Sequence, residues 1–383
     1  MKKRKKIVLL SLCGVVAVLF PLLLIAQYGK DPTNYQKAYI DSLEQIPTRN
    51  LKFDITKENI SVTNEENTDF KILQLSDIHF VGARFGKKLD LKALKAVYEM
   101  VDYVRPDLII YTGDIVYPTR LFGSNDNIKA ATVLNCFFEK MGVPFLYEFG
   151  NHDTEAFAKG RTNDLNKIFQ SNPYCYAKED DAIVYKYGRL SQGFEIRNYD
   201  DTLNTVLMLM DSGSYSDRVS FLSGYANFLS PHISWYHNKL NNVRKQEKLN
   251  NISDISSLAF FHIPPYEYSI AEKLYYQGSE EVTYLFGRND EKISCPNYAS
   301  GLFEKIVELG STKALFFGHD HKNSLALRYQ GVEFYYGHSI DYRAYPTIKY
   351  TDDYRGGLII TIKPDSTYEV IPQLLKDIPK EGI

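Results

Sequence analysis

Apolar and polar positions alternate in a regular order through the first half of the chain. An apolar run over residues 70–75 is followed by a polar loop and then by apolar positions at helical spacing over 91–101. The same order recurs further on, with predicted strands at 107–112 and 143–147 and a predicted helix at 127–141. Strands that alternate with helices in this way predict parallel strands joined by right-handed crossovers.

After residue 173 the pattern changes to shorter apolar stretches separated by polar turns, which indicates a second and more antiparallel sheet. Strands are predicted at 182–187, 194–197, 205–210, 258–261, 313–317, 325–329, 331–336 and 357–362. Helices are predicted at 233–248, with Pro231 at the first position, and at 298–309. Residues 266–297 show no clear period, so we expect a loop-rich excursion there.

The N-terminus departs from the pattern of a globular domain. Basic residues at 2–6 precede an uncharged run over 7–26, which is long enough to cross a bilayer. A cleaved signal peptide has a shorter apolar core and small residues before the cut, whereas Leu24 stands close to the end of this run. We therefore favour an uncleaved signal-anchor, with residues 1–6 as a basic cytoplasmic flank and the rest extracytoplasmic or lumenal. Cleavage of the run would make the protein secreted.

The remainder divides into a predicted stalk and edge strand over 27–69 and one domain over 70–383. A content of 44% hydrophobic and 24% charged residues is that of a globular protein with a sizeable core. The formal net charge of -2 offers no basic surplus for a nucleic-acid backbone, so no nucleic-acid-binding surface is expected. The sequence does not identify protein partners.

Five predicted strands end directly in side chains that can bind a metal ion. In chain order these ends carry Asp77 and His79, Asp114, Asn151 with His152 and Asp153, His262, and His319 with His321. Taken alone, each end has a plainer interpretation as a turn, a helix cap or a core histidine. Five of the chain's eight histidines lie in these segments, and the series as a whole favours a metal site at one sheet edge. Gly113, Gly150 and Gly318 are expected to let the backbone turn sharply beside the ligands.

In this order the five segments resemble the motif series of the calcineurin-like metallophosphoesterase superfamily, over about residues 70–338. The tyrosine-rich stretch at 331–337 and the Arg-Gly-Gly at 355–357 are most similar to its single-domain branch related to purple acid phosphatases. The resemblance implies a four-layer α/β/β/α sandwich behind the N-terminal transmembrane helix. It also implies a hydrolase of small phosphate mono- or diesters.

The resemblance further implies two metal ions about 3.5 to 4 Å apart, with a bridging hydroxide as the nucleophile. The first ion would be held by Asp77, His79, Asp114 and His321, and the second by Asp114, Asn151, His262 and His319. Asp114 would thus bridge the two ions. Carboxylate, imidazole and amide ligands suit iron, manganese or zinc, and the sequence does not choose among them.

His152 follows a ligand without being one, and the resemblance makes it the residue that contacts the phosphate and protonates the leaving oxygen. Together with Asp114 it is the predicted catalytic residue. Tyr117 stands where protein phosphatases of the superfamily carry an aspartate for this histidine, and where purple acid phosphatases carry a tyrosine ligand. We favour a supporting role beside the ligands for Tyr117, and Asp153 is a second candidate for orienting the site.

Two hypotheses compete with that of a membrane-anchored phosphoester hydrolase. One is a catalytically inactive, metal-binding interaction protein that retains the fold. The occupied ligand positions and His152 argue against it. The other is a membrane-anchored adhesion or structural protein, which has no need of ligand chemistry at five strand ends. Neither the loop after Gly82 nor residues 266–297 carry a recognisable motif, so substrate identity is not predicted.

Overall fold

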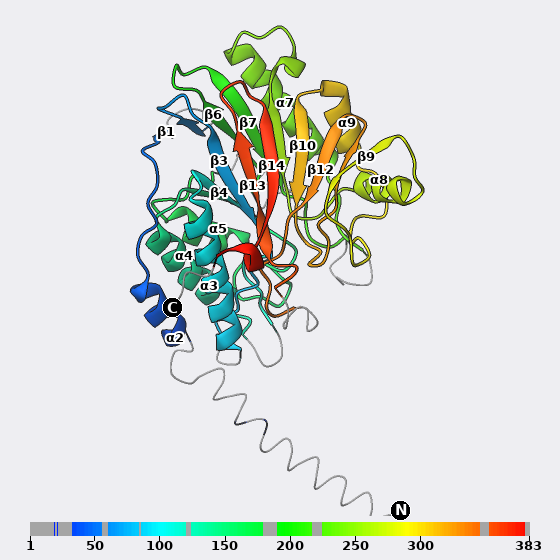
Figure 1. Ribbon diagram of the computed structural model, residues 1–383. Helices are drawn as coiled ribbons and strands as arrows, with labels where there is room; N and C mark the ends of the chain where they lie inside the picture. Colours follow the sequence, from blue (N-terminus) through cyan, green and yellow to red (C-terminus); the bar gives the residue numbers. More distant parts are fainter. Residues whose placement is uncertain are drawn as a thin grey trace, which may run out of the picture.

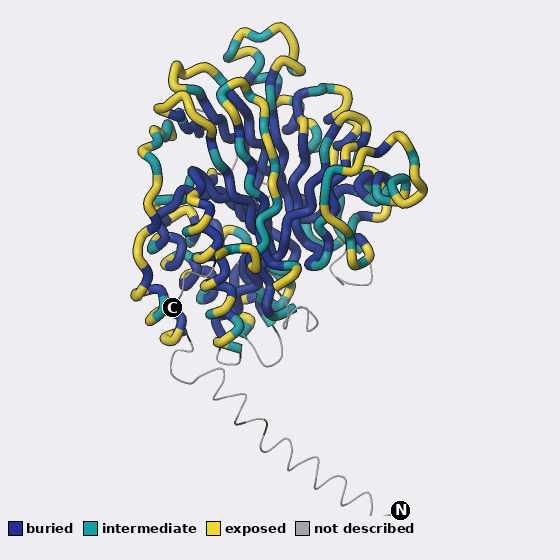
Figure 2. Tube along the Cα trace, viewed as in Figure 1, coloured by how far each residue is buried: buried dark blue, intermediate teal, exposed yellow. Residues whose placement is uncertain are grey.

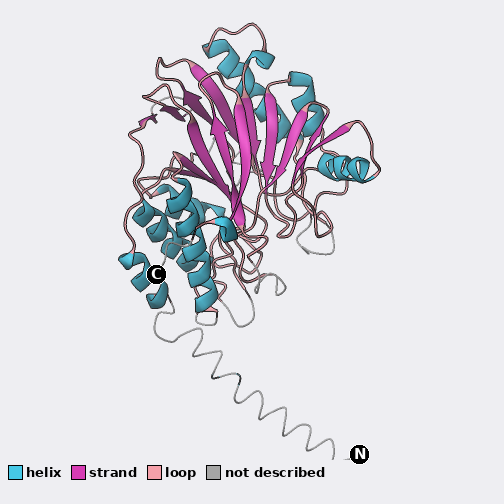
Figure 3. Cartoon of the chain, viewed as in Figure 1, coloured by secondary structure: helices cyan, strands magenta, loops and turns pink. Residues whose placement is uncertain are grey.

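The computed structural model describes residues 33–55, 60–83, 86–119, 124–178, 190–216, 224–344 and 352–379, together with Leu19 and Pro21. Within this part of the chain the strands form two sheets that lie against each other, with helices on the outside (Figures 1 and 3). This is a mixed α/β sandwich of the kind expected for a metallophosphoesterase.

The smaller sheet carries the first three predicted ligand segments. Its five strands lie in the order β14 (Tyr368–Leu374), β13 (Gly356–Ile362), β3 (Phe70–Leu75), β4 (Leu108–Thr112) and β5 (Phe145–Glu148). Strands β3, β4 and β5 are parallel, as the sequence predicts, while β13 pairs antiparallel with β3. The helices that connect and cover these strands are α3 (Lys87–Val104), α4 (Asn127–Met141) and α5 (Thr162–Gln170).

The larger sheet carries the other two ligand segments. Its nine strands lie in the order β1 (Lys52–Asp54), β2 (Ile60–Thr63), β6 (Gln192–Arg197), β7 (Leu203–Leu209), β8 (Ser257–Phe260), β10 (Thr312–Phe317), β12 (Val332–Tyr336), β11 (Ala326–Tyr329) and β9 (Val282–Phe286). The sheet is mixed rather than mainly antiparallel, because β7, β8, β10 and β12 are all parallel. Its helices are α7 (Ser230–Gln246), α8 (Tyr266–Tyr276) and α9 (Leu302–Leu309).

Alternation along β7 shows how the layers are built. Leu207 and Leu209 join the core cluster that includes β3, β4 and α3, whereas Val206 and Met208 join the cluster under α7, α8 and α9. Successive side chains of a strand point to opposite faces, so both faces of the larger sheet are covered. Figure 2 shows this as buried strands inside a shell of exposed turns and helix faces.

Some predicted elements differ from the structure. We expected a loop-rich excursion over 266–297. This prediction is wrong where α8 (Tyr266–Tyr276) and the edge strand β9 (Val282–Phe286) form. The buried residues of α8 are Glu267, Tyr268 and Ala271, and the carboxyl and hydroxyl groups among them hide the helical period. The sequence reading also did not find α5 and β14. The strand predicted at 182–187 lies outside the described residues.

The chain enters the folded domain earlier than expected. Helix α2 (Asn34–Ser42) lies within the predicted stalk and packs on α3 and α4. The predicted transmembrane segment 7–26 lies outside the described residues, apart from Leu19 and Pro21. No helix among the residues that the structure describes is long and apolar enough to span a bilayer.

Candidate metal centre

All five predicted ligand segments meet at one edge of the sandwich. The ends of β3, β4 and β5 bring Asp77, His79, Asp114 and Asn151, and the ends of β8 and β10 bring His262, His319 and His321. Three overlapping groups have potential ligand atoms within 4.8 Å of one another: Asp77, His79 and His321; His79, Asp114 and His152; Asp114, His262 and His319. Side chains from two sheets therefore form one buried cluster, in which Asp77 and His319 are 242 positions apart in sequence.

The backbone at this edge is strained. Asp77, His79, Asp114 and His319 have positive φ values of 55°, 52°, 50° and 86°. A non-glycine residue in this region costs of order 1–3 kcal/mol and persists only where the surrounding structure holds it. Nine described non-glycine residues have positive φ, and four of them are predicted ligands, so the strain is concentrated at the site.

Glycines beside the ligands are required by close contacts more than by turns. A Cβ atom at Gly113 would lie 2.5 Å from His262 Nδ1, and one at Gly150 would lie 2.1 Å from Asp114 Oδ1. Gly113 also has a φ of 86°, but Gly150 and Gly318 do not have positive φ, so the predicted sharp turn holds only at Gly113.

Asp114 is held so that one carboxylate oxygen faces both halves of the cluster. The backbone N–H of His152 donates to Asp114 Oδ1 at 2.8 Å. The other oxygen, Oδ2, lies 3.2 Å from His79 Nε2 and 3.2 Å from His262 Nε2. The structure thus places Asp114 where a bridging ligand would have to be.

His262 turns a lone pair toward two other acceptors. Its Nδ1 lies 2.8 Å from the carbonyl oxygen of Thr112, which only an N–H can satisfy, so Nε2 carries the lone pair. That Nε2 is 3.2 Å from Asp114 Oδ2 and 3.2 Å from Asn151 Oδ1. Asn151 Nδ2 donates to the Tyr215 hydroxyl at 3.0 Å, which fixes its oxygen on the side of His262. His319 Nδ1 also lies 3.2 Å from His262 Nε2. In the neutral form of the His262 ring, these oxygen and nitrogen atoms together form a site that suits a cation.

Asp341 holds two further ligands in the same way, and the sequence analysis did not find it. Its Oδ1 lies 3.3 Å from His79 Nδ1 and its Oδ2 lies 3.2 Å from His321 Nδ1. His321 Nδ1–H can therefore donate to Asp341, which in the neutral ring leaves the Nε2 lone pair facing Asp77. His79 Nδ1 faces Asp341 Oδ1 at ion-pair distance and makes no hydrogen bond within the described residues. The sequence did contain a signal for Asp341, because β12 is another apolar strand and Asp341 stands five residues after its end.

The donor set fits the metal ions that the sequence implies. Two carboxylates, four imidazoles and one amide oxygen suit iron, manganese or zinc. Asp77 Oδ1, which lies 3.4 Å from His321 Nε2, is buried and has no hydrogen-bond partner among the described residues. A metal ion would satisfy this atom, which would otherwise be costly to bury.

Burial and neighbouring charges shift the pKa values of the candidate ligands in different directions. Burial disfavours the charged carboxylate of Asp114, but nearby His262 and His152 hold its pKa well below the ordinary value. Burial and the neighbouring His262 lower the pKa of His319, so this imidazole is neutral. Burial also opposes the charged form of His321, yet Asp341 and Asp77 raise its pKa to about 9.

His152 lies at the mouth of the site rather than among the buried ligands. Its side chain is 25% exposed, and its Nδ1 lies 2.9 Å from Glu155 Oε1. The acidic partner expected for this histidine is therefore Glu155, three residues later in a turn and not identified from the sequence. The Tyr215 hydroxyl lies 3.4 Å from the same Glu155 oxygen and accepts from Asn151, which links the mouth to a ligand.

The two supporting residues predicted from the sequence occupy different places. Asp153 accepts from the backbone N–H groups of Asp114, Val116 and Gly150 at 2.9, 2.8 and 2.7 Å, so it ties together the loops after β4 and β5. Burial and nearby Asp114 raise the pKa of Asp153 to about 6. The ring of Tyr117 stacks on His79, with centroids 4.9 Å apart, and meets His152 edge-on at 4.8 Å. Tyr117 therefore packs against the imidazoles.

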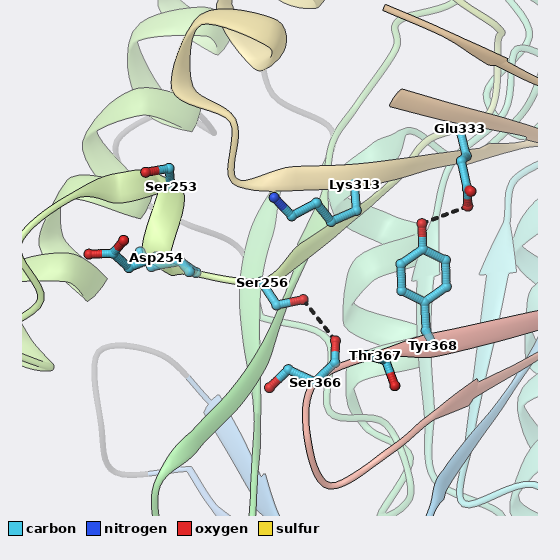
Figure 4. A pocket seen from close by; sticks show the side chains of 9 residues that line it. Ser253, Asp254, Ser256, Lys313, Glu333, Ser366, Thr367 and Tyr368 are labelled. Carbon is cyan, nitrogen blue, oxygen red and sulfur yellow. Dashed lines mark hydrogen bonds between the residues drawn. The ribbon is translucent and has the colours of Figure 1, made fainter. Parts of the chain in front are cut away.

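A separate cavity of about 410 Å³ lies at the opposite end of the sandwich, beside the starts of β8 and β10. Figure 4 shows the side chains that line it, where the Tyr368 hydroxyl donates to Glu333 at 2.7 Å. None of the potential metal-ligand groups found in the described residues includes a residue of this cavity. The metal chemistry is confined to the edge where β3, β4, β5, β8 and β10 end.

A two-sheet α/β sandwich with carboxylates and imidazoles converging on one shared carboxylate is the architecture of a dinuclear metalloprotein. The family model described as calcineurin-like phosphoesterase matches residues 70–323, and the chain belongs to this family. The predicted family is thus confirmed.

Similar proteins include plant and fungal relatives. The chain is 28% identical over 306 residues to Probable inactive purple acid phosphatase 14 of Arabidopsis thaliana, covering 73% of each chain. It is 26% identical over 275 residues to Phosphatase DCR2 of Saccharomyces cerevisiae, covering 68% of this chain and 45% of that protein. A solved dimetal phosphatase from Danio rerio has a TM-score of 0.47 at 12% identity, covering 79% of this chain and 98% of that one.

Proposed function

We propose that this chain hydrolyses phosphate mono- or diesters with a dinuclear metal centre held by the seven predicted ligands. The observation that carries the proposal is the convergence of potential ligand atoms on Asp114 Oδ2, with His79 Nε2 on one side and His262 Nε2 on the other, each at 3.2 Å. Two metal ions bound there would supply Lewis-acid polarisation of a phosphoryl oxygen and would lower the pKa of water.

His152 is the proposed general acid. Donation from Nδ1–H to Glu155 orients the ring and leaves Nε2 as the atom that can carry a proton to the leaving oxygen. The partial exposure of His152 supports this role, because an entering ester would reach His152 before the buried ligands. Glu155 acts through His152, because its contact with Nδ1 at 2.9 Å fixes the orientation of the ring.

The rival proposal is a metal-binding protein without activity. It takes support from the Arabidopsis relative, which is named a probable inactive phosphatase. The presence of His152 with its Glu155 partner at the mouth favours catalysis, because an inactive metal-binding protein has no need of a positioned proton donor.

A substrate panel separates these two proposals. Full-length protein in detergent is assayed on phosphomonoesters and phosphodiesters with manganese, iron or zinc, and its metal content is measured by elemental analysis. We expect close to two ions per chain and turnover of at least one ester class. Asp114→Asn should lose both metal and activity, whereas Asp353→Asn, an exposed carboxylate outside the ligand set, should keep both. Two bound ions with no turnover on any ester would favour the inactive protein.

We also propose that residues 7–26 anchor the chain in a membrane, with the catalytic domain extracytoplasmic or lumenal. The support is the twenty-residue uncharged run behind a basic flank. Secretion after cleavage of this run is the alternative.

A further inference from the structure

An exposed basic face lies on the first half of α3. Lys87, Lys88, Lys92 and Lys95 are all exposed there. None of them forms an ion pair with a carboxylate in the described part of the chain. Three instead lie over tyrosine rings. Lys87 is 5.0 Å from the centre of the Tyr35 ring, Lys95 is 5.7 Å from that of Tyr39, and Lys92 is 5.7 Å from that of Tyr342.

The carboxylates of α2 and α3 do not neutralise this face. Asp90 is buried and accepts from the backbone N–H groups of Val81 and Gly82 and from Arg343. The exposed Asp41 lies near the end of α2. Glu99 stands four residues after Lys95 and within electrostatic reach of Tyr39, so it compensates the Lys95 end of the face and leaves Lys87, Lys88 and Lys92 uncompensated. The two helices therefore present a cationic, tyrosine-containing surface at the ends where α3 begins.

This surface lies where the chain enters the domain, beside the metal centre. A Cβ at Gly82, three residues after His79, would lie 3.5 Å from Thr33 Cγ2, so Thr33 packs on the loop that carries a ligand. Gln36 Nε2 donates to the carbonyl oxygen of Lys87 at 3.3 Å, which fixes α2 to the start of α3. Figure 1 shows α2 and α3 together at the lower edge of the sandwich.

The distance from this surface to the proposed anchor is short. Residues 27–33 separate the uncharged run from α2. Fully extended, such a segment spans at most about 25 Å. An anchor in the bilayer would therefore hold the entry edge of the domain close to the lipid headgroups.

We propose that the face formed by Tyr35, Lys87, Lys88, Lys92 and Lys95 docks on an anionic bilayer and so holds the metal centre beside the membrane surface. The inference rests on the proposed anchor, and it narrows the substrates to phosphoesters presented at or near that surface. Each lysine at an anionic surface strengthens binding by roughly fivefold, and salt screens the attraction. Tyrosine is enriched at membrane interfaces for its apolar ring and polar tip.

Lysine labelling of the full chain in vesicles tests the docking without any assay of catalysis. The protein is reconstituted into phosphatidylcholine vesicles, with or without phosphatidylglycerol, and treated with a membrane-impermeant acylating reagent. Mass spectrometry then gives the acylation rate at each lysine. We expect rates at Lys87, Lys88, Lys92 and Lys95 to fall by about fivefold or more with phosphatidylglycerol and to recover at high salt. Equal rates in the two kinds of vesicle would overturn the proposal.

Charge-reversal variants provide the matched control. Lys88→Glu/Lys92→Glu should abolish the lipid-dependent protection of Lys87 and Lys95. Lys245→Glu/Lys273→Glu makes the same change in charge on exposed positions of α7 and α8 and should preserve it. Protection that survives the first pair, or that is lost equally with both pairs, would contradict docking through this face. Alkaline extraction of the same vesicles reports separately on the anchor, and phosphoester turnover reports separately on the proposed function.

Discussion

Replacement of Asp341 by asparagine should disable one metal ion and spare the other. The two carboxylate oxygens have different partners in the structure. Oδ1 accepts from the backbone N–H groups of Arg343 and Ala344 at 2.7 and 2.9 Å and also lies near His79 Nδ1. Oδ2 lies 3.2 Å from His321 Nδ1. Since the backbone donors need an acceptor, the oxygen of an introduced asparagine stays at the Oδ1 position, and its NH₂ group faces His321.

The size of the effect follows from this geometry. An NH₂ group donates to His321 Nδ1, which moves the ring proton to Nε2 and removes the lone pair that faces Asp77. Loss of a partner that orients a metal ligand typically costs about 10- to 100-fold in metal affinity. We expect at least this loss for the ion held by Asp77 and His321. The ion held by Asn151, His262 and His319 should change much less.

The assay is competitive titration of metal-stripped protein with zinc or manganese against a chromophoric chelator, which resolves two binding events. Elemental analysis after gel filtration should give close to two ions for the wild type and close to one for Asp341→Asn. Asp353→Asn, at an exposed position that pairs with Lys376, is the control and should retain both ions. Circular dichroism verifies that each variant is folded. A folded Asp341→Asn protein that binds two ions within a few-fold of wild-type affinity would refute the role assigned to Asp341.

Three further outcomes are expected. His152→Ala should keep both metal ions but slow hydrolysis of alkyl phosphates by a factor of about 10² to 10⁴. The effect on nitrophenyl esters should be small, because their leaving group needs no proton. Wild-type rates on an alkyl phosphate would remove His152 from the mechanism. Metal binding at pH 7 should release protons, because Asp341 and Asp77 raise the pKa of His321 to about 9 against the effect of burial. Metal affinity should therefore rise with pH and level off above that value. Calorimetry in buffers of different ionisation enthalpy measures the proton release, and binding without it would contradict the prediction. Full-length protein should resist alkaline carbonate extraction from membranes, and a soluble form beginning near residue 27 would show instead that the segment 7–26 is a cleaved signal.

Much of the site could be found from the sequence because each ligand sits at a local landmark. Asp77, Asp114 and His262 follow directly after apolar strands, and parallel strands place their ends at one edge of a sheet. The supporting residues have no such landmark. Asp341 comes five positions after β12 ends, and only the fold brings its carboxylate to His79, which is far away along the chain. Tyr215 reaches Asn151 in the same non-local way.

The order of elements was predictable wherever periodicity was strong, as over β3, α3, β4 and α4. It failed at α8, where Glu267 and Tyr268 are two of the three buried residues, and at β9, an edge strand that pairs with the distant β11. The amino-acid sequence by itself thus determined the ligand types, their order and the family. Which oxygen of Asp114 is shared, which acid orients His152, and which surface lies beside the ligands were decided only by tertiary structure. The physical reason is that hydrogen bonds and charge contacts act over a few ångströms in space, and chain separation does not encode that distance.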